Sequence, residues 1–220
     1  MKSQINYRLR GLDQANLAEV ELLNLMYYHP VVMAAKGYPS ADPLYGQKVD
    51  LMEPGADIFE AESVVTREAR DLAFAIADEY NHLVGWIWFY QDARHPLPIK
   101  VANRYGLTDK NCRFYQLSYE KLMSDGWPID LVNKVVHVKK EHLTIPRKGV
   151  VVKGLRLAIN RLIRGYRKLY AKRRTLALYA FVHPSNVASC KVLDTNGFTK
   201  IERMYSYDGE LHQLWVRIIK

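Results

Sequence analysis

The sequence has few of the features that mark specialised classes of protein. Its 220 residues include only two cysteines, Cys112 and Cys190, which allow at most one disulfide and cannot supply a zinc ligand set. No apolar run approaches the roughly 20 residues that cross a bilayer, and residues 1–6 lack the apolar centre of a secretory signal. Internal repeats and low-complexity linkers are absent too. We therefore expect a single cytoplasmic domain over residues 1–220, with reduced thiols and no metal.

Two common phosphate-binding motifs are also incomplete. Gly149 and Gly154 have the spacing of the P-loop glycines, but Leu155-Arg156 stands where Lys-Ser/Thr would bind the phosphates and magnesium. The dinucleotide fingerprint G-x-G-x-x-G is missing from this region as well. The sequence thus argues against a nucleotide hydrolase and against an NAD enzyme.

Acidic residues are fewer than basic residues in this chain. The chain has 32 Lys and Arg against 23 Asp and Glu, which gives a formal net charge of +9 and a sequence pI of about 9.4. Such an excess favours anionic partners, and nucleic acid, an anionic membrane face and a phosphorylated cofactor all fit it. The charge alone does not choose among them.

What is present is a regular alternation of strand and helix patterns. Helical spacing of apolar residues predicts helices over 15–26 and 155–169, and a short helix that ends near Asn196-Gly197. Strands interleaved with helices indicate an α/β or α+β sheet. The expected strands cover 5–10, 72–77, 83–90, 114–119, 134–138 and 176–182, and a last hairpin folds about Asp208-Gly209.

The segment from Pro146 to Gly154 lies between a predicted strand and the long amphipathic helix. Backbone N–H groups at a helix start lack internal partners, the helix dipole is positive there, and glycine lets an anion approach closely. A basic loop before a helix is also commonly plain solvated surface. The residues of the predicted anion site are Arg147, Lys148, Gly149, Val150, Val151, Lys153, Gly154 and Leu155.

The most specific pattern begins in the strand over 176–182. This strand leads into Asn186, the small residue Ser189 follows three positions later, and Gly197-Phe198 closes a short helix. Behind a glycine loop and an amphipathic helix, this order resembles the GNAT superfamily of coenzyme A-dependent N-acetyltransferases. A purely structural interpretation also exists, in which Asn186 caps the short helix, Gly197 ends it and Phe198 lies in the core.

The resemblance implies an α+β (α/β) fold with a mixed, mostly antiparallel central sheet, flanked by helices, whose central strands splay apart near Val138 and Val182. It also implies that the pantetheine arm of acetyl coenzyme A lies in this wedge, against Val138, Asn186 and Ser189, with its pyrophosphate on the loop N–H groups. The implied reaction is direct attack by an amine on the acyl, most simply acetyl, thioester. The amine acceptor and the oligomeric state cannot be read from the sequence.

The sequence departs from the family pattern at the proton donor. Seven residues after the asparagine, many members have a tyrosine that protonates the departing thiolate, and this chain has Leu193. Imidazole and carboxylate side chains are the usual bases near neutral pH. The candidates for proton transfer are His137, Glu141 and Tyr119, with His142 and Glu120 as further possibilities.

Two alternatives to acetyl transfer remain open at this point. The first is a binding module, or a degenerate member of the fold, whose basic helix docks on nucleic acid or on an acidic protein. The second is a long-chain N-acyltransferase, whose donor would be accommodated by the consecutive valines 150–152. The basic residues of the helix region are Arg156, Arg161, Arg164, Arg167, Lys168, Lys172, Arg173 and Arg174.

Overall fold

The fold was obtained as a computed structural model of the chain. The structure describes residues 6–12, 16, 19, 22–23, 61–66, 71–91, 96–121, 149–170, 174–207 and 209–220.

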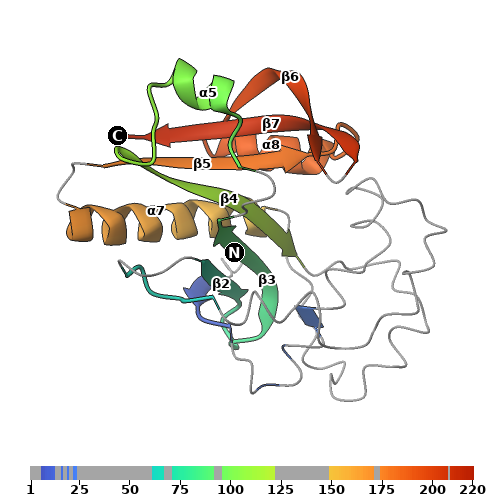
Figure 1. The fold of residues 1–220 in the computed structure, drawn as a ribbon. Coiled ribbons are helices and arrows are strands. Elements are labelled where there is room, and N and C mark those ends of the chain that lie inside the picture. The colour runs from blue at the N-terminus through green and yellow to red at the C-terminus, as the bar shows by residue number, and fades with distance from the viewer. Residues whose placement is uncertain are drawn as a thin grey trace.

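Seven strands form one sheet in the order β1-β2-β3-β4-β5-β7-β6 (Figure 1). Neighbouring strands pair antiparallel, except that β4 and β5 pair parallel. The sheet therefore consists of two antiparallel halves joined along one parallel seam, which confirms the predicted fold class. The strands are β1 (Arg8–Arg10), β2 (Leu72–Ala77), β3 (Leu83–Tyr90), β4 (Cys112–Lys121), β5 (Thr175–Val182), β6 (Thr199–Tyr207) and β7 (Glu210–Ile219).

Helices cover both faces of this sheet. The helices with described bounds are α5 (Ile99–Arg104), α7 (Val150–Tyr170) and α8 (Val187–Thr195). The long helix α7 buries one stripe of apolar side chains at spacings of three and four, as an amphipathic helix on a sheet does. The buried positions of α7 are Val150, Val151, Gly154, Leu155, Ala158, Ile159, Leu162 and Tyr166.

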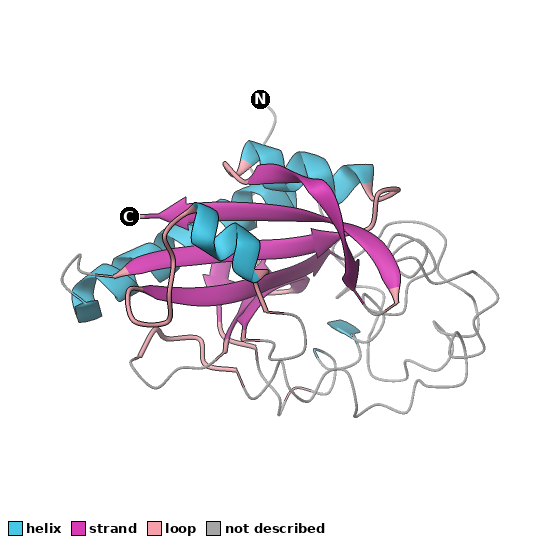
Figure 2. Cartoon of the chain, turned by 45° about the horizontal axis from the view of Figure 1, so that its top comes forward, coloured by secondary structure: helices cyan, strands magenta, loops and turns pink. Residues whose placement is uncertain are grey.

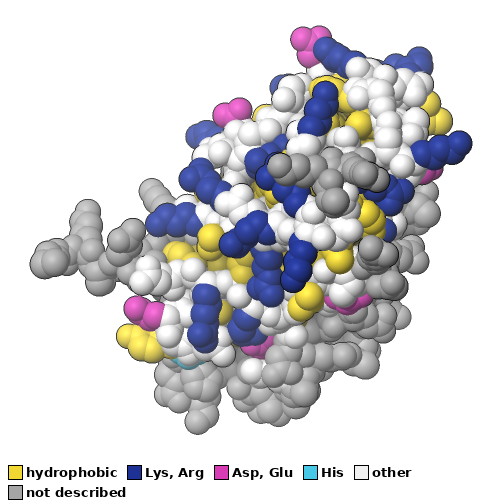
Figure 3. All heavy atoms as spheres, turned by 90° about the vertical axis from the view of Figure 1, so that its left-hand side faces the viewer, with side chains coloured by type: hydrophobic (Ala, Val, Ile, Leu, Met, Phe, Trp, Pro, Cys, Tyr) yellow, Lys and Arg dark blue, Asp and Glu magenta, His cyan; other side chains and the backbone are white. Residues whose placement is uncertain are grey.

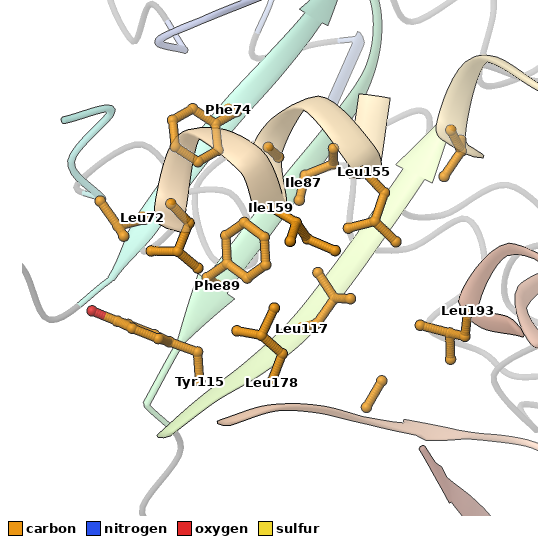
Figure 4. Close-up of a cluster of buried hydrophobic side chains, with 14 of the residues drawn as sticks. Leu72, Phe74, Ile87, Phe89, Tyr115, Leu117, Leu155, Ile159, Leu178 and Leu193 are labelled. Atoms are coloured by element: carbon orange, nitrogen blue, oxygen red, sulfur yellow. The ribbon is translucent and has the colours of Figure 1, made fainter. Parts of the chain in front are cut away.

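The main core lies between α7 and the sheet (Figure 4). Leu155 and Ile159 of α7 face Phe89, Leu117 and other apolar side chains of the strands, and all of them are buried. Burial of each such side chain contributes about 1.5–3 kcal/mol to the stability of the fold. The core therefore fixes the position of α7, including its N-terminal end, against the sheet.

The two faces of the sheet are covered by different helices, and we call them the α7 face and the α5 face. The α7 face carries α7 and α8, and its core cluster includes Leu117 of β4 and Leu178 of β5. The α5 face is covered in part by α5, whose Val101 belongs to a second cluster with Cys112 and Tyr179 (Figure 2). Because side chains alternate along a strand, successive residues of β4 belong alternately to these two faces.

Gly154 sets the approach of α7 to the sheet. A Cβ atom at this position would lie 2.4 Å from Cδ1 of Ile76 on β2, well inside van der Waals contact. A side chain at this point would require Ile76 to shift or the helix to move away from the strand.

Most predicted elements are confirmed. The structure contains the hairpin over 72–90, a strand around 114–119, the helix over 155–169 and the strand over 176–182, followed by a short helix and the C-terminal hairpin. The first predicted strand, over 5–10, is present as the shorter β1. Helix α5 was not predicted from the sequence.

The prediction was wrong about the partner of β5. The expected neighbour was the segment 134–138, but the strand paired parallel with β5 is β4, which lies more than a dozen residues earlier in the chain. The segment 134–138 itself lies outside the described residues. In the part of the chain that the structure describes, no helix has the length and apolar character needed to cross a membrane.

Candidate active site

The two central strands separate within the sheet. β4 and β5 are paired from Cys112–Thr175 to Gln116–Tyr179, and their mutual pairing ends there. Beyond this point β4 stays paired with β3 as far as Lys121, while β5 stays paired with β7 as far as Val182. Each strand follows its own half of the sheet, so a wedge opens between 117–121 and 180–182. The predicted splay is therefore present, with β4 as one of its sides.

The N-terminus of α7 has the properties of an anion site. Lys153 N–H donates to the Gly149 carbonyl oxygen at 3.0 Å, so the N–H groups of the preceding residues 150–152 have no acceptor within the helix. Gly149 has φ 84°, and a Cβ atom there would meet nothing within 4 Å. The first turn contains no acidic residue, and Lys153 is exposed. This combination favours a phosphate group.

The predicted anion-site residues fall into different environments. Val150, Val151 and Leu155 direct buried side chains to the core, so only their backbones can reach a ligand. The N–H groups of Gly154 and Leu155 lie in the second turn of α7, where the helix supplies carbonyl acceptors. Among the members of the set from 149 onward, Gly149 and Lys153 are exposed.

The short helix α8 begins at the end of β5. Asn186 is its N-cap, and the side-chain Oδ1 accepts a hydrogen bond from Ser189 N–H at 3.0 Å. Gly197 ends the helix with φ 74°, and Phe198 is 4% exposed in the core. The structural part of this motif, with Asn186 as the cap, Gly197 as the helix end and Phe198 in the core, is therefore confirmed. It leaves the Asn186 Nδ2 group as the atom that can donate to a ligand.

Tyr119 connects the two sides of the wedge on the α7 face. Its hydroxyl group, carried by β4, donates to the backbone carbonyl of Ser189 in α8 at 3.2 Å. Burial raises the pKa of Tyr119, and the hydrogen bond to Ser189 offsets only part of this effect. The phenol is therefore neutral near pH 7, and the raised pKa makes it a weaker acid than a free tyrosine.

Leu193 occupies the position at which the family often has a tyrosine. Its side chain is 0% exposed and belongs to the main core (Figure 4). Ser189 lies one turn earlier, on the same side of α8. The phenol of Tyr119 thus reaches the side of α8 that carries Leu193, from the opposite strand of the wedge.

The α5 face at the end of the seam and beyond it carries buried polar groups, of which the sequence singled out only Glu120. Glu120 is a further proton-transfer candidate from the sequence, and it is 7% exposed. Trp86 lies directly opposite Glu120 in the strand register. Gln116, the last residue of β4 in the seam, is 3% exposed and its Nε2 donates to the Tyr207 hydroxyl at 3.2 Å. Only the strand pairing brings these residues together, because sequence periodicity does not give the register.

The remaining predicted residues are not placed by the structure. These residues lie outside the described part of the chain, and they are His137, Val138, Glu141, Arg147 and Lys148. Among the described residues, no group of three or more His, Cys, Asp or Glu side chains is arranged to hold a metal ion.

Comparison with known proteins gives similarity in structure only. No known family profile matches the sequence, and no curated protein matches it either. Solved structures do match. The GNAT domain of S. lividans PAT is 10% identical, with a TM-score of 0.53 over 97% of this chain and 90% of that one. The chain has the GNAT fold.

Two further structures with this fold are acetyltransferases. Aminoglycoside acetyltransferase AAC(6')-Ib in complex with coenzyme A is 13% identical, with a TM-score of 0.50 over 96% of this chain and 94% of that one. Ribosomal-protein-S5-alanine acetyltransferase from Vibrio fischeri is 16% identical, with the same TM-score over 96% and 92%. At these identities the similarity establishes the GNAT fold and leaves the reaction to be argued from the site.

Proposed function

We propose that this protein transfers an acyl group, most simply acetyl, from a coenzyme A thioester to an amine. The observation that carries the proposal is the wedge between β4 and β5, together with the N-terminus of α7, which packs on the α7 face of the sheet. An extended pantetheine arm can lie along the separated strand edges as an added strand does. The GNAT fold supports this proposal, since one of the acetyltransferases that share it was solved with coenzyme A.

The donor would be held by groups of both helices. The pyrophosphate would accept hydrogen bonds from the N–H groups of residues 150–152, with added attraction from Lys153 and from the preceding Arg147 and Lys148. Asn186 Nδ2 would donate to a carbonyl of the pantetheine arm. We infer that Ser189 lines the same channel, as the family resemblance implies.

The chemical step requires one proton acceptor and one proton donor. The amine nitrogen attacks the thioester carbonyl, the C–N bond forms, and the C–S bond breaks to release the coenzyme A thiolate. Glu120 is our preferred acceptor of the ammonium proton, with His137 and Glu141 as the alternatives. Tyr119 is our preferred donor to the thiolate, since its hydroxyl lies on the α8 side of the wedge.

The state of the cysteines favours direct attack over a covalent enzyme intermediate. Burial raises the pKa of the Cys190 thiol, the one beside Ser189 in α8, above its usual range. Burial raises that of Cys112 to about 12. Both effects oppose the thiolate form that a cysteine nucleophile requires.

Calorimetry with acetyl coenzyme A tests the proposal most directly. We expect a measurable heat of binding, and a melting temperature that rises with acetyl coenzyme A concentration by mass action. Release of free thiol in the presence of an amine would then demonstrate transfer. An unchanged melting temperature together with no heat at saturating acetyl coenzyme A would exclude this function.

A second candidate is docking of the basic helix on an acidic macromolecule. α7 carries six Lys and Arg and no Asp or Glu, and five of the six are exposed. Figure 3 shows Lys and Arg side chains spread over the side of the molecule where the C-terminal end of α7 lies. Binding to RNA that weakens steeply with salt, without any heat from acetyl coenzyme A, would support this candidate instead.

A further inference from the structure

The α5 face beyond the seam contains buried polar atoms without hydrogen-bond partners. The indole Nε1–H groups of Trp86 and Trp88 and the Oε1 atom of Gln116 are all buried and unsatisfied. Trp86 is 2% and Gln116 is 3% exposed. A buried polar group left without a partner costs about 1–3 kcal/mol, so groups of this kind commonly mark the place of a water or a ligand.

These groups form one continuous surface because of the strand register. Trp86 of β3 lies opposite Glu120 of β4, Trp88 lies opposite Ser118, and the next pair joins Tyr90 to Gln116. Residues directly opposite each other on one face have Cβ atoms about 5 Å apart. We call this row, Trp86, Trp88, Tyr90, Gln116, Ser118 and Glu120, the β3–β4 wall.

Stacked aromatic rings lie both within the wall and beside it. The rings of Trp88 and Tyr90 stack at 4.3 Å between centroids. On the other side of the wedge, the rings of Phe181 and Tyr207 stack at 5.1 Å, and the Tyr207 hydroxyl accepts the hydrogen bond from Gln116. The wall therefore continues across the point where β4 and β5 separate.

Within β3, β4 and β5, the charged side chains divide between the two faces of the sheet. The strands β3 and β5 contain no Lys or Arg, and the two basic residues of β4, Arg113 and Lys121, occupy positions of the α7 face. Glu120 is the one carboxylate that these three strands place on the wall. The side chains of these three strands therefore favour a polyanionic donor on the α7 side and a single positive charge beside Glu120 on the wall.

We infer that the β3–β4 wall binds the acceptor, and that the acceptor is a primary amine with one positive charge, a flat apolar body and an uncharged oxygen. This inference rests on the proposed function. The amine would donate to Glu120, the body would stack on the aromatic rings, and the uncharged hydroxyl or amide group at its far end would accept from an indole N–H and donate to Gln116 Oε1, four residues along β4. A single carboxylate suits one ammonium group better than the several of a polyamine.

A comparison of acceptors tests this inference. With saturating acetyl coenzyme A, the probes are tyramine and phenylalaninamide, set against spermidine and the tripeptide Ser-Ala-Gly. We expect kcat/KM for the better aromatic monoamine to exceed that for spermidine and the tripeptide by about tenfold or more. Equal or higher kcat/KM for spermidine or for the tripeptide would overturn the inference.

Two substitutions connect the preference to the wall. Gln116→Leu removes the unsatisfied oxygen, and Trp88→Phe removes an indole N–H while it keeps a ring. Each is expected to lower kcat/KM for the aromatic amine by about tenfold and to leave the Kd of acetyl coenzyme A unchanged. Tyr80→Ser, which removes an aromatic ring that is 72% exposed, serves as the control and should change neither value.

A binding readout independent of turnover completes the test. Titration of tyramine into the protein with coenzyme A should change the tryptophan fluorescence, and Trp88→Phe should reduce this change. If acetyl coenzyme A binds while no aromatic monoamine reacts or alters the fluorescence, the inference fails and the proposed function stands. If acetyl coenzyme A does not bind at all, both fail.

Discussion

At the scale of single residues, the two polar atoms of the Asn186 side chain have separable roles. Oδ1 caps α8, whereas Nδ2 is the proposed donor to the pantetheine arm. Asn186→Asp keeps the cap and removes the donor, so we expect near-parental stability with weaker acetyl coenzyme A binding, by about 1–3 kcal/mol. Asn186→Ala should lose both the binding and about 1 kcal/mol of stability. Urea unfolding and calorimetry measure the two effects. Parental affinity in Asn186→Asp would remove this residue from the donor site.

Leu193 is predicted to serve packing alone. Because its side chain is fully buried, Leu193→Ala should cost about 2–5 kcal/mol of unfolding free energy. Leu193→Tyr overfills the same space and should cost about 1–3 kcal/mol, without any gain in turnover. Val187→Ala in the same helix, at a position 57% exposed, is the control. A stable Leu193→Tyr protein with faster turnover would show instead that this position faces the thioester sulfur.

The sequence reveals the residues of local motifs better than those of the sheet. The capping role of Asn186 follows from its place before a short helix, and the positive φ of Gly197 follows from the helix end. Gln116 and Trp88 gave no such signal. Their importance depends on the pairing of β4 with β3 and β5, which fixes their common face and cannot be inferred from the spacing of residues along the chain.

At the scale of elements, the contact of α7 with β2 depends on Gly154. Gly154→Ala places a Cβ atom against Ile76, which should force the helix away from the strand and cost about 1–3 kcal/mol. Ile76→Val removes the interfering Cδ1 atom, so the double variant should recover part of the loss although Ile76→Val alone destabilises. Denaturant unfolding of the four proteins gives the coupling energy. Simple addition of the two losses would mean that the helix does not press on Ile76.

The elements themselves were largely predictable, whereas one partnership was not. Apolar runs identified β2, β3 and β5, and a helical period identified α7, because each pattern is local. The segment 134–138 has the apolar character of a strand, and the sequence therefore predicts it as the neighbour of β5. The true neighbour, β4, is less uniformly apolar because one of its faces carries the polar row of the wall.

At the scale of the whole molecule, buried phenols predict a loss of stability in alkaline solution. Burial raises the pKa of Tyr115 and Tyr119, and that of Tyr166 to about 12. Unfolded phenols ionise near pH 10, so above that pH the unfolded chain binds fewer protons than the folded chain. The contribution of these phenols to the free energy of unfolding should therefore be constant below about pH 9 and fall as the pH rises past 10.

Tyr119→Phe isolates one contribution to this alkaline loss. The variant loses the hydrogen bond to Ser189, at a cost of about 1 kcal/mol near pH 8, but its stability should fall less steeply than that of the parent between about pH 10 and 11. Tyr80→Phe, at an exposed position, should follow the parental slope. Urea unfolding over this pH range decides the matter, and parallel curves for Tyr119→Phe and the parent would refute the assignment.

The parallel seam also has a consequence for the order in which the chain folds. The antiparallel hairpins β2–β3 and β6–β7 join residues close in sequence, whereas the five residue pairs of the seam join Cys112–Gln116 to Thr175–Tyr179 across a long intervening stretch. Closing such a loop is slow, so the seam is expected to form late. A ligand that bridges β4 and β5 would then act chiefly as a brake on unfolding, and would lengthen the lifetime of the native state more than it hastens folding.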